Sequence, residues 1–145
     1  MSRKTAREQV YKLIYERCVN EEPEEFSLQL ALDGCNEDDG IFIRKLFEGV
    51  NENYEFLKSI VERYSKGFSF ERIFKIDCAV IMVAAYEILY LDDIPVKVSI
   101  NEALEFVKAY STDKSFSFVN GVLASVVKEK EVLLSERESE LQQVD

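Results

Sequence analysis

The sequence contains no histidine, and it has only five glycines, two prolines and three cysteines. The absence of histidine excludes Ser/His and Cys/His catalytic dyads, histidine general bases and most catalytic zinc sites. The glycines are too scattered to form a phosphate-binding loop, and the odd number of widely spaced cysteines matches neither a disulfide framework nor a zinc knuckle. We therefore expect a protein that is not an enzyme and that needs no metal ion and no cofactor.

Long apolar runs are also missing. The longest stretch, residues 78–91, is interrupted by Glu87 and flanked by Asp77 and Asp92, so it is too short and too charged to span a bilayer. The first five residues lack the apolar core of a signal peptide. These features predict a cytoplasmic protein that does not contact a membrane.

The residues that are plentiful favour a single helical domain. The 145 residues are 47% hydrophobic and 32% charged, which provides enough apolar surface for one real core. Scarce glycine and proline leave few positions for hairpin turns, whereas alanine, leucine, glutamate and lysine are abundant. We predict an all-α fold that forms one domain over residues 1–145.

The spacing of apolar residues predicts where the helices lie. Thr5 and Glu8 have capping-box spacing, so a first helix is expected from Thr5 to about Asn20, with residues 1–4 as a mobile basic arm. Residues 77–91 are apolar nearly all round, which is typical of a core helix that the others enclose. Ser99 and Glu102 form a second capping box. The same spacing predicts helices over residues 26–34, 41–50, 54–67, 99–110 and 115–127, and a frayed acidic tail over about 135–145.

The net charge of −10 is distributed unevenly. Residues 1–20 carry five basic and two acidic side chains, whereas residues 21–40 carry eight acidic side chains and no basic one. Because the Debye length is about 8 Å at physiological salt, a ligand at the N-terminus responds mainly to the local positive cluster. Arg7 lies beside Tyr11 and Tyr15 on the first helix, which suits phosphate contact and base stacking. Two simpler interpretations stay open: basic residues can merely keep a terminus solvated, and such tyrosines often form the margin of a core.

Two motifs in the C-terminal half are specific. Residues 95–103 read PVKVSINEA, and residues 117–123 read SFVNGVL. Together with Asp77, the string Ala85-Tyr86-Glu87 and the start at Thr5, they closely resemble the NusB antitermination family over essentially the whole chain. The resemblance implies a compact bundle of about seven helices in two sub-bundles. It also implies a function without catalysis: NusB proteins pair with NusE, a small-subunit ribosomal protein, bind the boxA element of nascent rRNA transcripts, and help RNA polymerase to read through terminators.

The resemblance implies RNA contacts at two places. Arg3, Lys4 and Arg7 match the family's arginine-rich N-terminal motif, in a thinner form. Lys114 and Phe118 fall where the last helix begins and where family members also touch RNA. An exposed Phe118 would offer a stacking face, whereas a buried one would belong to the core, and the sequence leaves both open.

The resemblance also implies where NusE would bind. Glu71 and Asp77 fall where the family presents acidic contacts to the basic NusE. Asp77 has a second interpretation, as the N-cap of the core helix. We interpret Glu87 as the anchor of an ion pair or hydrogen bond and Glu102 as a capping residue.

Other functions remain compatible with the sequence. One is a helical protein-interaction adaptor with little RNA binding, which the acidic surface favours, and another is a detached NusB-like domain of an rRNA methyltransferase. The oligomeric state stays open between monomer and homodimer. The thin basic motif predicts that the isolated chain binds RNA weakly and that NusE completes a composite RNA surface.

Overall fold

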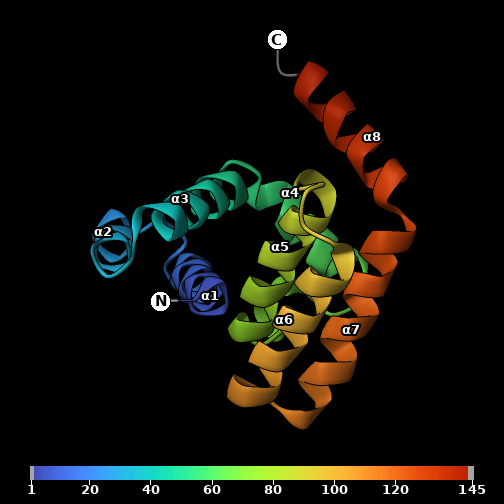
Figure 1. Ribbon diagram of the computed structural model, residues 1–145. Helices are drawn as coiled ribbons and strands as arrows, with labels where there is room; N and C mark the ends of the chain where they lie inside the picture. The colour runs from blue at the N-terminus through green and yellow to red at the C-terminus, as the bar shows by residue number, and fades with distance from the viewer. Residues whose placement is uncertain (1, 144–145) are drawn as a thin grey trace.

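The protein is built from helices throughout the described part of the chain. The computed structural model describes residues 2–143, and within them it contains eight α-helices, one short 3-10 helix and no strand (Figure 1). None of the helices in this range has both the length and the apolarity that crossing a membrane requires. The all-α prediction is confirmed. The elements are α1 (Arg3–Asn20), α2 (Glu25–Asp33), α3 (Glu37–Glu52), α4 (Tyr54–Arg63), η1 (Phe70–Arg72), α5 (Lys75–Tyr90), α6 (Val96–Tyr110), α7 (Asp113–Lys128) and α8 (Lys130–Gln142).

Helix α5 lies at the centre of the fold because it has no polar face to expose. Every residue from Asp77 to Ala85 is buried, and so are Glu87, Ile88 and Leu89. Helices α1, α3, α4, α6, α7 and α8 all pack against α5. Since burying each large apolar side chain is worth about 1.5–3 kcal/mol, this helix contributes much of the free energy that holds the bundle together. The predicted core helix is confirmed.

The other contacts divide the helices into two groups. Helices α1, α2 and α3 contact one another, while α6 and α7 contact each other and α5. Helix α4 contacts both α3 and α5. In Figure 1, α2 and α3 form one side of the molecule, and α6 and α7 form the other. Buried side chains from Ala6 to Leu133 join both groups in one apolar cluster. This arrangement is the pair of sub-bundles that the sequence resemblance implied.

The start of α1 differs from the prediction. The helix begins at Arg3 because Ser2 is its N-cap, and the Ser2 hydroxyl accepts a hydrogen bond from the Thr5 amide at 3.1 Å. The Thr5 hydroxyl is 3.0 Å from the same Ser2 hydroxyl, so it supports this cap and does not start the helix itself. Arg3 and Lys4 therefore lie in the first helical turn, and the prediction of a mobile arm is wrong for residues 2–4. Met1 lies outside the described residues.

The second predicted capping box is also wrong. Helix α6 begins at Val96, three residues before Ser99. The Ser99 hydroxyl is buried and donates to Glu87 Oε1 at 3.0 Å, so it caps no helix. Glu102 is consequently not a capping residue, and its carboxylate lies 3.7 Å from the Lys4 ammonium.

The predicted acidic tail is mostly an ordered helix. Helix α8 begins after Glu129, where the helical ladder of α7 breaks, and it extends away from the bundle in Figure 1. Leu133 is buried. The Arg137 guanidinium lies 5.4 Å from the centre of the Phe56 ring and donates to the Asn53 side-chain oxygen at 3.1 Å. These contacts hold α8 as far as Arg137, so the fraying predicted for residues 135–145 stays a prediction for the exposed turns beyond it, while positions 144–145 lie outside the described residues.

One glycine allows α3 and α5 to approach closely. Gly49 is buried in α3, and a Cβ atom placed on it would lie 2.1 Å from Cζ of Tyr86 in α5. No real Cβ tolerates such a distance, so the tyrosine ring occupies the space that a side chain at position 49 would need.

Candidate nucleic-acid interface

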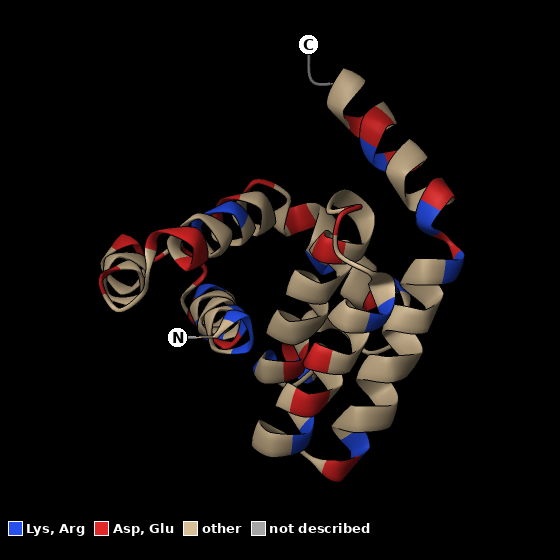
Figure 2. Ribbon diagram, viewed as in Figure 1, with Lys and Arg blue, Asp and Glu red and all other residues tan. Residues whose placement is uncertain are grey.

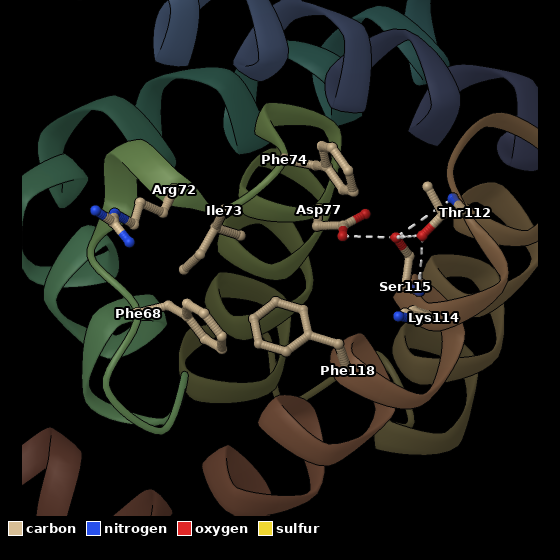
Figure 3. A pocket seen from close by; sticks show the side chains of 9 residues that line it. All are labelled: Phe68, Arg72, Ile73, Phe74, Asp77, Thr112, Lys114, Ser115 and Phe118. Carbon is tan, nitrogen blue, oxygen red and sulfur yellow. Dashed lines mark hydrogen bonds between the residues drawn. The ribbon is translucent and has the colours of Figure 1, made fainter.

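An open cavity of about 240 Å³ lies where the segment preceding α5 meets the start of α7. Three phenylalanines from separate elements meet there: Phe68 precedes η1, Phe74 is the N-cap of α5, and Phe118 belongs to α7. We call this the phenylalanine cavity. Its lining, drawn in Figure 3, consists of Phe68, Arg72, Ile73, Phe74, Asp77, Thr112, Lys114, Ser115 and Phe118.

The aromatic rings of the phenylalanine cavity are available for contact. Phe68 is 57% exposed and Phe74 is 61% exposed. Phe118 is half-buried: it packs against the core and also lines the cavity, where it lies next to Phe68 in Figure 3. The two interpretations of Phe118 therefore hold together, because one part of the ring belongs to the core and another faces the cavity.

Asp77 forms the polar wall of the phenylalanine cavity. Its Oδ1 accepts a hydrogen bond from the Ser111 hydroxyl at 2.8 Å, and its Oδ2 accepts one from the Ser115 hydroxyl at 2.7 Å. Ser115 also forms the capping box of α7 with Thr112 (Figure 3). Asp77 thus ties the first turn of α5 to the first turn of α7, where its negative charge also suits the helix dipole of α5.

Neither predicted role of Asp77 describes its position fully. The N-cap prediction is wrong, because Phe74 is the N-cap of α5 and Asp77 is the third helical residue. Its carboxylate is buried, and both of its oxygens accept hydrogen bonds from within the fold. A partner could therefore reach Asp77 only through the wall of the phenylalanine cavity.

Two cations stand at the rim of the phenylalanine cavity. Arg72 and Lys114 lie on opposite sides of it in Figure 3. Both side chains are exposed, and neither forms an ion pair with any of residues 2–143. Exposed rings flanked by uncompensated cations are the combination that holds a base by stacking and a phosphate by charge.

Glu71 adds an exposed negative charge beside Arg72 on η1. A hydrogen bond to its own backbone amide lowers the pKa of Glu71, and the nearby Lys58 lowers it further. The carboxylate is therefore charged near neutral pH and exposed, and its predicted contact with a basic partner stays a prediction.

Arg7 is the predicted RNA contact that the structure places elsewhere. Its side chain is only 4% exposed, and its guanidinium donates to the Glu87 carboxylate through Nε at 3.1 and 3.2 Å and through Nη2 at 2.9 Å. Burial by itself would lower the pKa of Arg7, but the hydrogen bonds to Glu87 and the attraction of the surrounding negative charges together raise the pKa. In this structure the Arg7 guanidinium is engaged in a buried ion pair and is not exposed to a phosphate, so its predicted RNA contact stays a prediction. The role predicted for Glu87, as an anchor, is confirmed.

Arg3 and Lys4 are exposed, but each has an acidic neighbour. Arg3 Nε lies 3.3 Å from Asp39 Oδ1, and its guanidinium lies 4.3 Å from the centre of the Phe42 ring. Lys4 pairs with Glu105 in α6 and lies near Glu102. Any phosphate that binds these two cations must compete with carboxylates of the same chain.

Two further hollows lie along α1 and α6. The first, of about 240 Å³, is lined by Lys4, Glu8, Glu102, Glu105, Phe106, Ala109 and Tyr110. The second, of about 270 Å³, is lined by Tyr11, Lys12, Tyr15, Ile76, Phe106 and Tyr110. The two hollows share Phe106 and Tyr110, and Ile76 precedes Asp77 of the phenylalanine cavity. Lys4 and Lys12 therefore line neighbouring hollows, and Tyr15 and Tyr110 are exposed there.

Sequence reasoning missed four residues of this surface: Phe68, Arg72, Phe74 and Tyr110. The sequence did contain one signal for Phe68, Arg72 and Phe74, namely an aromatic-rich stretch directly after Gly67. In the structure Gly67 has a φ of +98° and ends the preceding helical region. Apolar rings at a break between helices are not explained by helix packing. Tyr110 carried no such signal, because its helical spacing also fits the core.

The fold and this surface together define an all-helical protein with exposed aromatic rings between two cations. The sequence profile of the NusB family matches residues 4–128. The transcription antitermination protein NusB of Acetivibrio thermocellus is 40% identical over 132 residues, which cover 90% of this chain and 91% of that protein. Its counterpart in Bacillus licheniformis is 41% identical over 127 residues, or 87% of this chain and 96% of that one. The chain belongs to the NusB family.

Solved structures agree with this assignment. The structure of T. maritima NusB matches with a TM-score of 0.79 and 28% identity, covering 89% of this chain and 92% of that one. A structure of the antitermination factors NusB and NusE in complex with dsRNA contains the same fold, with a TM-score of 0.77 and 22% identity over 87% of this chain and 96% of that one. The family match ends at Lys128, so helix α8 lies beyond it.

Proposed function

We propose that this protein is a transcription antitermination factor that binds boxA-type RNA of nascent rRNA transcripts together with NusE and promotes read-through by RNA polymerase. Membership of the NusB family supports this function. The observation that carries the RNA-binding part is the phenylalanine cavity, where the exposed Phe68 and Phe74 and the half-buried Phe118 stand between the cations Arg72 and Lys114, which are unpaired among residues 2–143.

The chemistry of the phenylalanine cavity suits a single-stranded base. The core fixes the Phe118 ring on one side. The ring therefore loses little conformational entropy when a base stacks on its other side. Lys114 is four residues earlier, one turn away on the same helix, so it can meet the phosphate of a stacked nucleotide. Double-stranded RNA would keep its bases inside the helix and could not use this cavity in the same way.

The N-terminal cations extend the RNA path but contribute little by themselves. Arg7 is internal, Arg3 is next to Asp39, and Lys4 is next to Glu102 and Glu105. The isolated chain is therefore a weak RNA binder. NusE, a basic protein, would contact Glu71 and the acidic wall near Asp77, supply additional positive charge, and complete a composite RNA surface.

The proposal is tested by measuring the binding of boxA RNA to the protein with and without NusE. We expect NusE to tighten RNA binding, Phe118→Ala to weaken it by roughly tenfold, since a stacked base is worth about 1–3 kcal/mol, and Lys114→Ala to lower the salt slope by about 0.7. Phe116→Ala is the matched control, because Phe116 is exposed on the same helix but does not line the phenylalanine cavity. Equal affinity with and without NusE would refute the composite surface.

The same measurement separates the rival functions. A helical adaptor without RNA binding would bind NusE but not boxA RNA in either condition. We further infer that the chain acts by binding and not by catalysis, as one domain over residues 1–145, and in the cytoplasm, where bacterial RNA polymerase works. The single apolar cluster from Ala6 to Leu133 supports the one-domain inference.

A further inference from the structure

Helix α2 presents an apolar face that nothing in residues 2–143 covers. Phe26 and Leu30 are one turn apart and are 74% and 59% exposed. Phe26 is the most exposed large apolar side chain of the described residues. Leu28, on the opposite side of α2, is the residue that the helix buries completely in the core. Leaving a phenylalanine in water forgoes the free energy that its burial would provide, so this face is suited to a partner.

A groove continues this apolar face between α2 and α1. It has a volume of about 260 Å³ and is lined by Gln9, Lys12, Leu13, Glu16, Ser27, Leu30 and Ala31. The Ser27 hydroxyl donates to the Glu16 carboxylate at 2.7 Å, which fixes the two helices relative to each other. The exposed stripe therefore ends in a depression that has an apolar part, formed by Leu13, Leu30 and Ala31, which can accept an apolar side chain. Its remaining lining is polar, with Gln9, Lys12, Glu16 and Ser27.

Acidic side chains surround the exposed stripe. Residues 21–40 contain eight acidic residues and no basic one, and Figure 2 shows them over α2 and the turn into α3. Asp39 is buried next to Arg3, but the other seven carboxylates form no ion pair with any residue between 2 and 143. They are Glu21, Glu22, Glu24, Glu25, Asp33, Glu37 and Asp38. A partner at this face meets apolar contacts in the middle and uncompensated negative charge at the edge.

We propose that the α2 face, defined by Phe26, Leu30 and the groove with α1, binds a basic amphipathic segment of a partner protein. Such a segment would place apolar side chains on Phe26 and in the groove and basic side chains on the surrounding carboxylates. The negative charge disfavours RNA and anionic lipid. It also disfavours a second copy of this chain bound through the same face, because the two acidic surfaces would then oppose each other.

The α2 face and the phenylalanine cavity are separate binding sites. In Figure 1, α2 lies at one side of the molecule, and α7, which carries Phe118, lies at the other. The α2 face can therefore be occupied while RNA is bound at the cavity. The inference does not depend on the RNA-binding proposal.

The test uses a defined probe, a fluorescent peptide of leucine and lysine arranged as an amphipathic helix. A scrambled peptide of the same composition has no apolar face and controls for charge alone. We expect the amphipathic peptide to bind the wild-type protein at least about tenfold more tightly than the Phe26→Ser/Leu30→Ser variant. Val132→Ser, which alters another exposed apolar residue, on α8, should leave binding unchanged.

Two further measurements complete the test. Glu22→Gln/Glu25→Gln should weaken peptide binding, more at low salt than at high salt. Amide chemical shifts in the NMR spectrum should move on α2 and the facing part of α1, and boxA RNA binding should be unaffected by the Phe26→Ser/Leu30→Ser change.

Three results would overturn the inference: equal binding of the scrambled peptide, equal binding to the double serine variant, or shifts confined to other helices. Dimerisation of the wild-type chain that the double serine variant abolishes would also overturn it, because a second copy would then be the occupant. The Phe26→Ser/Leu30→Ser and Glu22→Gln/Glu25→Gln variants change exposed side chains, so each should have the same urea midpoint of unfolding as the wild-type protein. This midpoint is measured first.

Discussion

Replacing Arg7 by alanine should destabilise the fold strongly and leave RNA binding by the folded protein unchanged. The Arg7 guanidinium makes three hydrogen bonds to Glu87, and the two side chains are 4% and 0% exposed. Without Arg7, the buried Glu87 carboxylate keeps only the Ser99 hydroxyl as a side-chain donor. Breaking a buried pair in this way typically costs about 3–5 kcal/mol, which is a large share of the roughly 5–15 kcal/mol by which a domain is stable.

Urea denaturation followed by circular dichroism measures this loss. With a slope of about 2 kcal/mol per molar urea, a cost of about 3–5 kcal/mol lowers the midpoint by roughly 1.5–2.5 M. The double variant Arg7→Met/Glu87→Leu removes both charges and should recover most of the loss, because no unpaired charge is then buried. Lys12→Ala is the matched control, since Lys12 is exposed on the same helix and should change stability by less than about 0.5 kcal/mol.

The reasoning would be refuted by either of two results. One is an Arg7→Ala midpoint within about 0.5 M of the wild-type value, which corresponds to about 1 kcal/mol. The other is a decrease of about 0.7 in the salt slope of RNA binding, which is the signature of one lost phosphate contact. Either result would mean that the Arg7 side chain reaches the surface.

Three other predictions follow from particular contacts. Gly49→Ala should lower the free energy of unfolding by about 1–3 kcal/mol in urea denaturation, because the new Cβ would overlap the ring packed on position 49. Glu105→Gln should tighten boxA RNA binding roughly two- to fivefold at low salt by freeing Lys4, as measured by fluorescence anisotropy. Burial raises the pKa of Cys18 from 9.0 to about 11 and that of Cys78 from 9.0 to about 12. Above about pH 9 the unfolded chain therefore loses thiol protons that the folded chain keeps, and stability should fall as the pH rises from about 9 to 11.

Each of these predictions has a control. Gly121→Ala should be neutral or slightly stabilising, because a Cβ there meets no atom within 4 Å, and equal losses at both glycines would contradict the packing argument. Glu131→Gln removes an exposed charge far from Lys4 on α8, so an equal gain in RNA affinity would indicate a general charge effect. Stability that is constant between about pH 9 and 11 would contradict the burial of the two thiols, as would rapid alkylation of Cys18 in the folded protein.

The helical class and the core helix followed from local information. The scarcity of glycine and proline indicates a helical protein without reference to any distant residue. The apolar segment 77–91 indicates the core helix in the same way, because a soluble helix that is apolar all round has no stable position except the centre of a bundle. The motifs at residues 95–103 and 117–123 were sufficient to reveal the family resemblance for the same reason: they are continuous in sequence.

The helix starts show where local patterns stopped being informative. The two capping boxes were predicted from a hydroxyl and a carboxylate three residues apart, and this spacing also occurs inside helices. Ser99 fits the pattern, but its hydroxyl is directed at Glu87, twelve residues earlier. Whether a serine caps a helix or serves a buried carboxylate depends on which side chains the fold brings within reach.

The binding residues divide in the same way. The sequence by itself determined the class, the core and the presence of basic and aromatic residues near both ends of the chain. Tertiary structure alone decided that Arg7 pairs with Glu87, eighty positions away, and that Phe68 and Phe74 meet Phe118 in one cavity. The physical reason is that a charge is available to a ligand only if the fold leaves it uncompensated, and compensation comes from residues that are distant in sequence and close in space.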